Sequence, residues 1–126
     1  MIKHINTLGT KLPFNQAVRC GDFVYVSGQA SVNPDTGEII SGTLEEEMAL
    51  SFQNLRAVLD SAGAGWSQIV KLNCFLCRET DLTEYNQLYR RFFSDPFPAR
   101  TTLTNCLPPT VLFEVDCVAY APQTNP

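Results

Sequence analysis

Val111-Leu112-Phe113-Glu114-Val115-Asp116-Cys117-Val118-Ala119-Tyr120 is the stretch of this sequence with the clearest periodicity. Every second residue from Val111 to Ala119 is apolar, and the residues between them mix apolar side chains with two acids. Because successive side chains of a strand point to opposite faces of its sheet, the stretch predicts a strand with one apolar face and one mixed face. The apolar face should pack against the core.

Two segments have the apolar spacing of helices that could cover this face. The first begins with the capping box Thr43-Leu44-Glu45-Glu46, whose hydroxyl and carboxylate satisfy free backbone N–H groups, and it stops at Gly63. The second begins near Asp81, and Pro96 prevents its continuation. The residues expected to be buried are Met48, Phe52, Leu55 and Leu59 in the first helix, and Leu82, Tyr85, Leu88 and Phe92 in the second.

Further strands are expected before, between and after these two helices in the sequence. Residues 16–20 and 23–28 are typical of a hairpin around Gly21-Asp22. Residues 68–77 should form a strand whose apolar face holds Val70, Leu72, Cys74 and Leu76, and residues 100–106 should form a hairpin-like pair with 111–120. The pattern predicts an α+β fold in one domain, residues 1–126, with five or six strands and two helices on one sheet face. Residues 121–126 should be a frayed end.

The second face of the sheet is left uncovered by this arrangement. On the last strand it carries the alternating set Leu112, Glu114, Asp116, Val118 and Tyr120, which is half apolar and half charged. An exposed patch of this kind usually marks an interface. We therefore expect a homo-oligomer that packs these sheet faces together.

Composition narrows the class of protein. The chain has 126 residues, 44% of them hydrophobic and 17% charged, with a net charge of −4. These values are typical of a globular domain, and the acidic balance without a basic patch argues against nucleic-acid binding. The sequence shows neither a signal peptide nor an apolar run long enough for a membrane span, so we expect a cytosolic protein that does not bind membranes.

The five cysteines are Cys20, Cys74, Cys77, Cys106 and Cys117. An odd number without an export signal indicates free thiols, and one histidine makes a metal site improbable. Cys74-Phe75-Leu76-Cys77 matches the C-x-x-C pattern of redox pairs, but it lies in the expected strand, where residues three apart point to opposite faces. We interpret these two cysteines as structural.

Three features could bind or convert a ligand. Arg100 begins a strand after Phe97-Pro98-Ala99, and its guanidinium can hold a carboxylate through two parallel hydrogen bonds. Glu114 lies on the mixed face of the next strand, so a hairpin-like pairing would place it near Arg100. A carboxylate there could hold or deprotonate a water. Ser27-Gly28 ends a strand where a ligand could approach the backbone closely. Each feature has a structural alternative: Arg100 and Glu114 could form an ion pair, and Ser27-Gly28 could simply end its strand.

The sequence resembles the RidA/YjgF/UK114 family of enamine and imine deaminases, also labelled L-PSP endoribonucleases. The resemblance runs through Pro13-Phe14-Asn15-Gln16-Ala17, Val26-Ser27-Gly28-Gln29, the turn 33–38, Asn86, and Phe97-Pro98-Ala99-Arg100 followed by Phe113-Glu114-Val115. It implies a chorismate-mutase-like fold, with a mixed sheet of about six strands, assembled as a homotrimer with clefts between subunits. It also implies that no cofactor is required.

The resemblance assigns roles to the residues above. Arg100 would bind the substrate carboxylate, Glu114 would position the attacking water, and Ser27, Gly28 and Asn86 would line the pocket. The reaction would be hydrolysis of a 2-aminoacrylate-type enamine, through its imine, to a 2-keto acid and ammonia. Two positions depart from active members: Phe14 stands where many have tyrosine, and Thr102 where many have cysteine.

These departures leave alternatives open. Phe14 and Thr102 are compatible with a larger substrate, an amino-dienoic acid such as 2-aminomuconate, or with a non-catalytic trimer that binds small acids. Cleavage of RNA, suggested only by the older family label, is disfavoured by the acidic balance and the absence of a basic surface.

Overall fold

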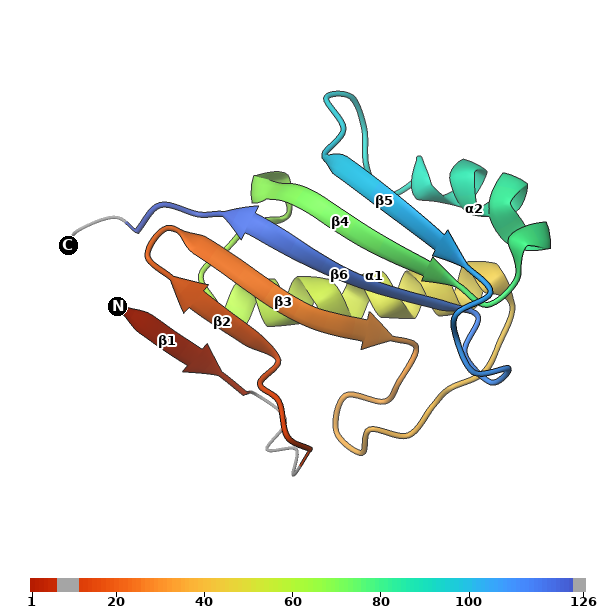
Figure 1. Cartoon of the computed structure of the whole chain (residues 1–126), viewed down its shortest axis with the longest axis horizontal. Helices are drawn as coiled ribbons and strands as arrows, with labels where there is room; N and C mark the ends of the chain where they lie inside the picture. The colour runs from red at the N-terminus through yellow and green to blue at the C-terminus, as the bar shows by residue number, and fades with distance from the viewer. Residues whose placement is uncertain (7–11, 124–126) are drawn as a thin grey trace.

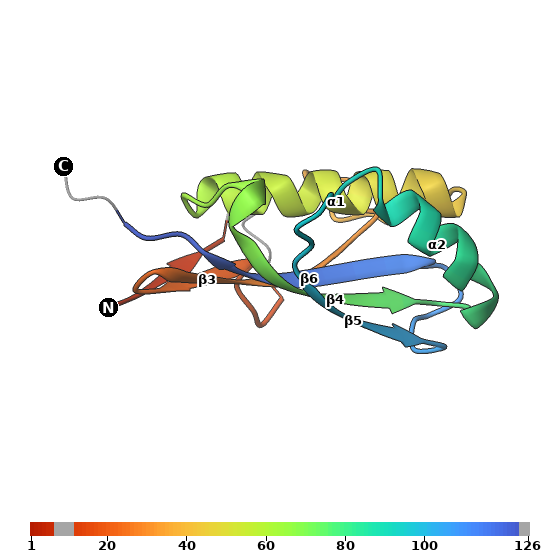
Figure 2. The ribbon, with the colours of Figure 1, turned by 90° about the horizontal axis from the view of Figure 1, so that it is seen from above.

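A computed structural model describes residues 1–6 and 12–123 of the chain. Six strands form one sheet in the order β1-β2-β3-β6-β4-β5 (Figure 1). The strands are β1 (Ile2–Ile5), β2 (Ala17–Cys20), β3 (Phe23–Ala30), β4 (Ile69–Leu76), β5 (Ala99–Thr104) and β6 (Phe113–Tyr120). The helices α1 (Leu44–Ser61) and α2 (Leu82–Tyr89) both lie on one face of this sheet (Figure 2). The predicted α+β fold, with a mixed sheet covered on one face, is confirmed.

The connection between β5 and β6 differs from the prediction. The two strands are not neighbours, because β4 lies between them, parallel to β5 and antiparallel to β6. The expected hairpin-like pairing is therefore wrong. Residues 105–112 form a loop long enough to pass across the end of β4, whereas a two-residue turn would have forced the strands to pair.

The alternation of β6 is confirmed. Its buried residues face the helices, and they pack on the apolar side chains of α1 in one core. The buried side chains of β4 also face the helices, but the predicted burial of one of its residues is wrong. Val70 is 44% exposed, because the register shifts between Ile69 and Lys71 and places Ile69 in the core instead. A bulge of this kind is not visible in a residue pattern.

Both helices start close to where the sequence predicts. The capping box of Thr43 and Glu46 is present, and the chain turns after α1 at Gly63, whose φ is +78°. Helix α2 ends at Tyr89, which is buried, whereas Leu82 is exposed. The expectation that Leu82 is buried is therefore wrong, since the helix turns that residue away from the sheet.

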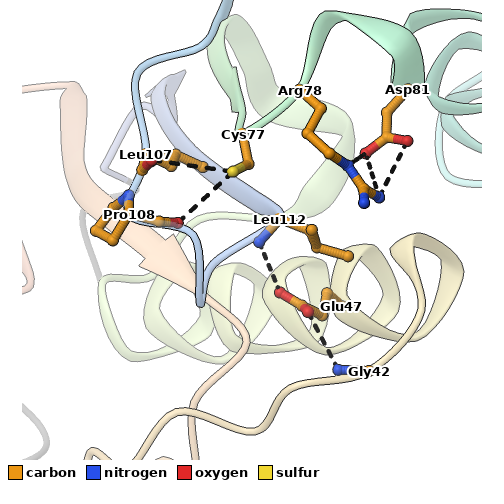
Figure 3. A network of polar contacts seen from close by, with 8 residues as sticks. All are labelled: Gly42, Glu47, Cys77, Arg78, Asp81, Leu107, Pro108 and Leu112. Carbon is orange, nitrogen blue, oxygen red and sulfur yellow. Dashed lines mark hydrogen bonds and ion pairs between the residues drawn. The ribbon is translucent and has the colours of Figure 1, made fainter.

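A buried carboxylate ties the start of α1 to β6. Glu47 is 1% exposed and accepts hydrogen bonds from the backbone N–H groups of Gly42, at 3.1 Å, and Leu112, at 3.0 Å (Figure 3). Because both oxygens have donors, the buried charge is compensated. The contact fixes the loop before α1 against the residue that precedes β6.

A buried arginine closes the opposite end of the molecule. Arg19 donates to the carbonyls of Ala62 at 2.9 Å and Ala121 at 2.8 Å. Ala121 is itself buried, and its N–H donates to the Asp22 carbonyl at 2.7 Å. The expectation that the frayed end begins at residue 121 is therefore wrong at Ala121, while residues 124–126 lie outside the described part.

Candidate functional site

Arg100 lies on the helix-covered side of the sheet. It is in register with Leu72 of β4, and Leu72 is fully buried beneath the helices. Residues in register on adjacent strands share a face, so the Arg100 side chain projects toward α2. There the guanidinium lies 4.6 Å from the ring centre of Tyr89 and 5.0 Å from that of Tyr85, and it donates to Asn86 Oδ1 at 2.9 Å.

A cavity of about 220 Å³ adjoins the guanidinium. Two features of this cavity suit a small organic acid: the rings of Tyr89 and Phe97 give it an apolar wall, and the solvent-exposed Arg100 provides a positive charge. No carboxylate of residues 1–6 or 12–123 forms an ion pair with Arg100. The residues that line the cavity are Asn86, Tyr89, Arg90, Phe97, Pro98 and Arg100.

Thr102 lies two residues beyond Arg100 in β5, on the same face of the sheet. Its hydroxyl is 2.8 Å from the Tyr85 hydroxyl, and it is in register with the buried Cys74. Burial raises the pKa of the Cys74 thiol to about 11 and that of Tyr89 to about 12. Burial also raises the pKa of Tyr85. These groups therefore stay neutral at physiological pH, and Arg100 carries the charge of this part of the site.

Glu114 lies on the opposite, uncovered face of the sheet. It is in register with Phe75 and Ala30, whereas its neighbours Phe113 and Val115 are fully buried on the helix side. A β-carbon on Gly28 would overlap the Glu114 carboxylate, so the absence of a side chain at Gly28 makes room for it. Burial raises the pKa of Glu114, and the negative charge of Asp116 raises it further.

Ser27 connects this region to the segment that carries Phe14. The Ser27 hydroxyl donates to the Asn15 carbonyl at 2.7 Å, and its backbone N–H donates to the Gln16 carbonyl at 2.8 Å. The Ser27 hydroxyl is therefore a structural donor in a single chain. Phe14 is 48% exposed.

The structure thus separates the predicted site residues into two groups. Arg100, Asn86 and Thr102 lie on the helix side near α2, whereas Glu114 lies with Gly28 on the uncovered side. The expectations that a hairpin-like pairing brings Glu114 near Arg100, and that the two could form an ion pair, are both wrong within one chain. Strand β4 separates their strands, and the pleat directs the two side chains to opposite faces.

Two tyrosines of this region were not predicted as functional residues. Tyr85 and Tyr89 are spaced by four positions on α2, so both rings meet the same arginine. In the sequence Tyr85 is indistinguishable from an ordinary core position of an amphipathic helix. Only the pairing of β5 with β4, under α2, reveals its contact with Arg100.

Comparison with known proteins decides the family. The sequence profile of the family described as Endoribonuclease L-PSP matches residues 4–121. The chain belongs to the RidA/YjgF family. The family carries deaminases among its members: a protein of Dermatophagoides farinae named 2-iminobutanoate/2-iminopropanoate deaminase is 40% identical over 91 residues, which cover 72% of this chain and 71% of the relative.

Solved structures of RidA/YjgF proteins share this fold. The YyfA protein of Yersinia pestis, described as a member of the Rid family, has a TM-score of 0.86 at 30% identity, with 96% of this chain and 100% of that chain covered. The TdcF protein of Escherichia coli, solved with bound serine, has a TM-score of 0.81 at 32% identity, with 94% and 98% covered.

No helix within residues 1–6 and 12–123 is long and apolar enough to cross a membrane. In the same residues, no three His, Cys, Asp or Glu side chains are grouped so that they could hold a metal ion.

Proposed function

We propose that this protein is a cofactor-independent hydrolytic deaminase of small imine and enamine acids, of the 2-aminoacrylate and 2-iminopropanoate type. The observation that carries the proposal is the state of Arg100. Its guanidinium is held by two aromatic rings and Asn86, lies beside a cavity, and has no carboxylate partner among the described residues. An arginine fixed in this way is prepared to bind the carboxylate of a small acid.

The reaction requires few catalytic groups from the protein. Water adds to the electrophilic imine carbon, and the resulting carbinolamine releases ammonia as its C–N bond breaks, which leaves a 2-keto acid. Glu114 holds the attacking water and passes both of its protons in turn to the nitrogen, the first as water adds to the imine carbon and the second as the C–N bond of the carbinolamine breaks. Its raised pKa suits this exchange, because a carboxylate with a higher pKa is a better base and can also release the proton.

The separation of Arg100 and Glu114 supports an intersubunit site. One chain holds the two residues on opposite faces of the sheet, so a cleft that contains both must take them from two copies. The uncovered face offers the surface for such assembly, since it carries several exposed apolar side chains, among them Phe23, Tyr25, Leu103 and Tyr120. We propose a homotrimer that completes each site with Glu114, Gly28 and Ser27 of a neighbouring copy, and with Phe14 at its edge.

The comparisons support the class of ligand. The Dermatophagoides farinae relative is named for two short 2-imino acids, and the Escherichia coli structure holds serine, also a small molecule with a carboxylate. Small acids of this kind suit a cavity of about 220 Å³ that Arg100 helps to line.

The proposal is tested by coupling the protein to a PLP-dependent serine dehydratase and following pyruvate release. Wild type should accelerate release, and Arg100→Ala should lose about 100-fold or more in kcat/KM, since it removes a bidentate charged contact. Arg78→Ala is the matched control, because Arg78 pairs with Asp81 and does not line the cavity beside Arg100. Identical traces for wild type and Arg100→Ala would overturn the assignment.

A second candidate, non-catalytic binding of small acids, is favoured by Phe14 and Thr102. Phe14 lacks a hydroxyl, and that of Thr102 is already bonded to Tyr85. Under this alternative, benzoate or 2-oxobutyrate binds to wild type and not to Arg100→Ala, while no enamine, including larger amino-dienoic acids, is hydrolysed. Calorimetric titration together with the coupled assay separates the two candidates.

A further inference from the structure

The C-x-x-C pattern places Cys77 beside Cys74 in sequence, but the fold gives Cys77 a different neighbour. Cys74 is fully buried on the helix side of β4, whereas Cys77 follows the end of that strand and is partly exposed. In the parallel pairing of β4 with β5, Leu76 is in register with Thr104. The chain beyond Thr104 therefore brings Cys106 alongside Cys77.

Each of these two thiols contacts the backbone next to the other cysteine. Cys106 Sγ lies 4.0 Å from the carbonyl oxygen of Leu76, whose peptide bond continues directly into Cys77. Cys77 Sγ lies 3.9 Å from the carbonyl oxygen of Leu107, the residue after Cys106, and 3.7 Å from that of Pro108 (Figure 3). Standard peptide dimensions then place Cys106 Sγ within about 7 Å of the Cys77 Cα.

The surroundings allow the two sulfurs to approach. Cys106 is exposed, and it belongs to the loop 105–112, outside any strand. The S–H···O contacts of both thiols are long and therefore weak, so little interaction is lost when a side chain rotates. Leu76 and Thr104 end adjacent strands, so the backbones that carry Cys77 and Cys106 leave the sheet side by side, and the loop 105–112 can adjust their spacing to that of a disulfide.

We propose that Cys77 and Cys106 are a redox pair that forms a reversible intrachain disulfide. The oxidant is a low-molecular-weight disulfide such as oxidised glutathione. One cysteine thiolate attacks it and releases one glutathione thiolate, and the second cysteine thiolate then displaces the other glutathione. Two thiols lose two hydrogens, and the oxidant is reduced to two molecules of glutathione.

The bond would enclose the Arg100 half of the site. The ring it closes spans residues 77–106, which contain α2 and β5 with Asn86, Arg100 and Thr102. A cross-link across such a loop reduces the conformational freedom of the unfolded chain. The oxidised protein would therefore hold this segment together under conditions that unfold the reduced protein.

The test oxidises the full chain in glutathione redox buffers and analyses it by mass spectrometry without reduction. The intact mass should fall by about 2 Da, the expected loss of two hydrogens. Tryptic peptides 72–78 and 101–126 should be linked, and fragmentation should place the bond between Cys77 and Cys106. The Tm of the oxidised form should exceed that of the reduced form by about 5 °C or more, and dithiothreitol should abolish the difference.

Single variants complete the test. Cys77→Ser and Cys106→Ser should each abolish the linked peptide and the Tm difference, whereas Cys20→Ser, which removes another exposed thiol, should retain both. A glutathione adduct that persists on Cys106, a bond that involves Cys20, Cys74 or Cys117, or a linked peptide without a rise in Tm would overturn the proposal. None of these outcomes depends on the deaminase assay.

Discussion

At the scale of single residues, Arg100 depends on neighbours that carry no charge. Two rings lie within 5.0 Å of its guanidinium, and it donates a hydrogen bond to the neutral amide oxygen of Asn86. Because none of these contacts neutralises it, Arg100 keeps its charge for a ligand. A structural ion pair would have used that charge within the protein.

Gly28 should control the position of the Glu114 carboxylate, so even the addition of one methyl group at Gly28 should displace it. In Gly28→Ala the new β-carbon overlaps the flexible end of Glu114, which has to move, and the φ of Gly28 is not positive. We expect kcat in the coupled assay to fall at least about tenfold, while the free energy of unfolding changes by less than about 1 kcal/mol. Gly65→Ala is the control, since its β-carbon would meet only ordinary contact at 3.8 Å. Equal kcat for both variants would contradict the role given to Gly28.

The raised pKa of Glu114 predicts a pH dependence of stability. Burial and the charge of Asp116 raise the folded-state pKa above that of the unfolded chain. The favourable contribution of the protonated carboxyl is therefore complete below the unfolded pKa and is lost as pH rises through the folded value. Relative to Glu114→Gln, wild type should lose Tm as pH rises above the ordinary range of a glutamate carboxyl and through its raised folded-state pKa. Melting curves of both proteins check this, and parallel curves would show that Glu114 is not perturbed.

At the scale of elements, α2 carries one side of the proposed carboxylate site on eight residues. Tyr85, Asn86 and Tyr89 occupy neighbouring positions on one helical surface, and all three contact Arg100. The parallel pairing of β5 beside β4 places Arg100 under that surface. Neither element would form the arrangement alone.

The ring of Tyr89, and not its hydroxyl, should support the binding of substrate by Arg100. The hydroxyl is buried, and no partner is found for it in the described part of the chain. Tyr89→Phe should therefore keep KM near wild type and leave stability unchanged or raised by up to about 1 kcal/mol. Tyr89→Leu removes the cation–π contact and should raise KM several-fold. Steady-state kinetics and thermal melts of both variants measure this, and a rise in KM for Tyr89→Phe would mean that the hydroxyl binds substrate.

At the scale of the whole molecule, the two groups of site residues face different sides of one sheet. An intersubunit site predicts complementation between two inactive variants. Arg100→Ala and Glu114→Gln, refolded together in equal amounts, should recover about a quarter of wild-type activity, because that share of the sites of a randomly mixed oligomer has both residues intact. Each variant refolded alone is the control. If the mixture stays as inactive as its components, the site does not combine Arg100 and Glu114 from different copies.

Much of the fold follows from local patterns. The alternation of β6, the capping box of α1 and the turn at Gly21 each depend on near neighbours in the chain, so the sequence predicts them well. Val70 and Leu82 are mispredicted because a bulge and the orientation of a helix depend on packing partners that are distant in sequence. The choice of Arg100 and Glu114 as candidates came from residue type and family resemblance, while their placement required the structure.

The sequence by itself determined the layers of this protein, because apolar periodicity reports which side of each strand and helix is buried. Residue type and the family resemblance also made Arg100 the candidate that binds the carboxylate of a small acid. Only the tertiary structure decided the strand order, since pairing depends on contacts between segments distant in the chain. That order inserts β4 between β5 and β6, directs Arg100 and Glu114 to opposite faces, and brings Cys77 to Cys106 instead of Cys74.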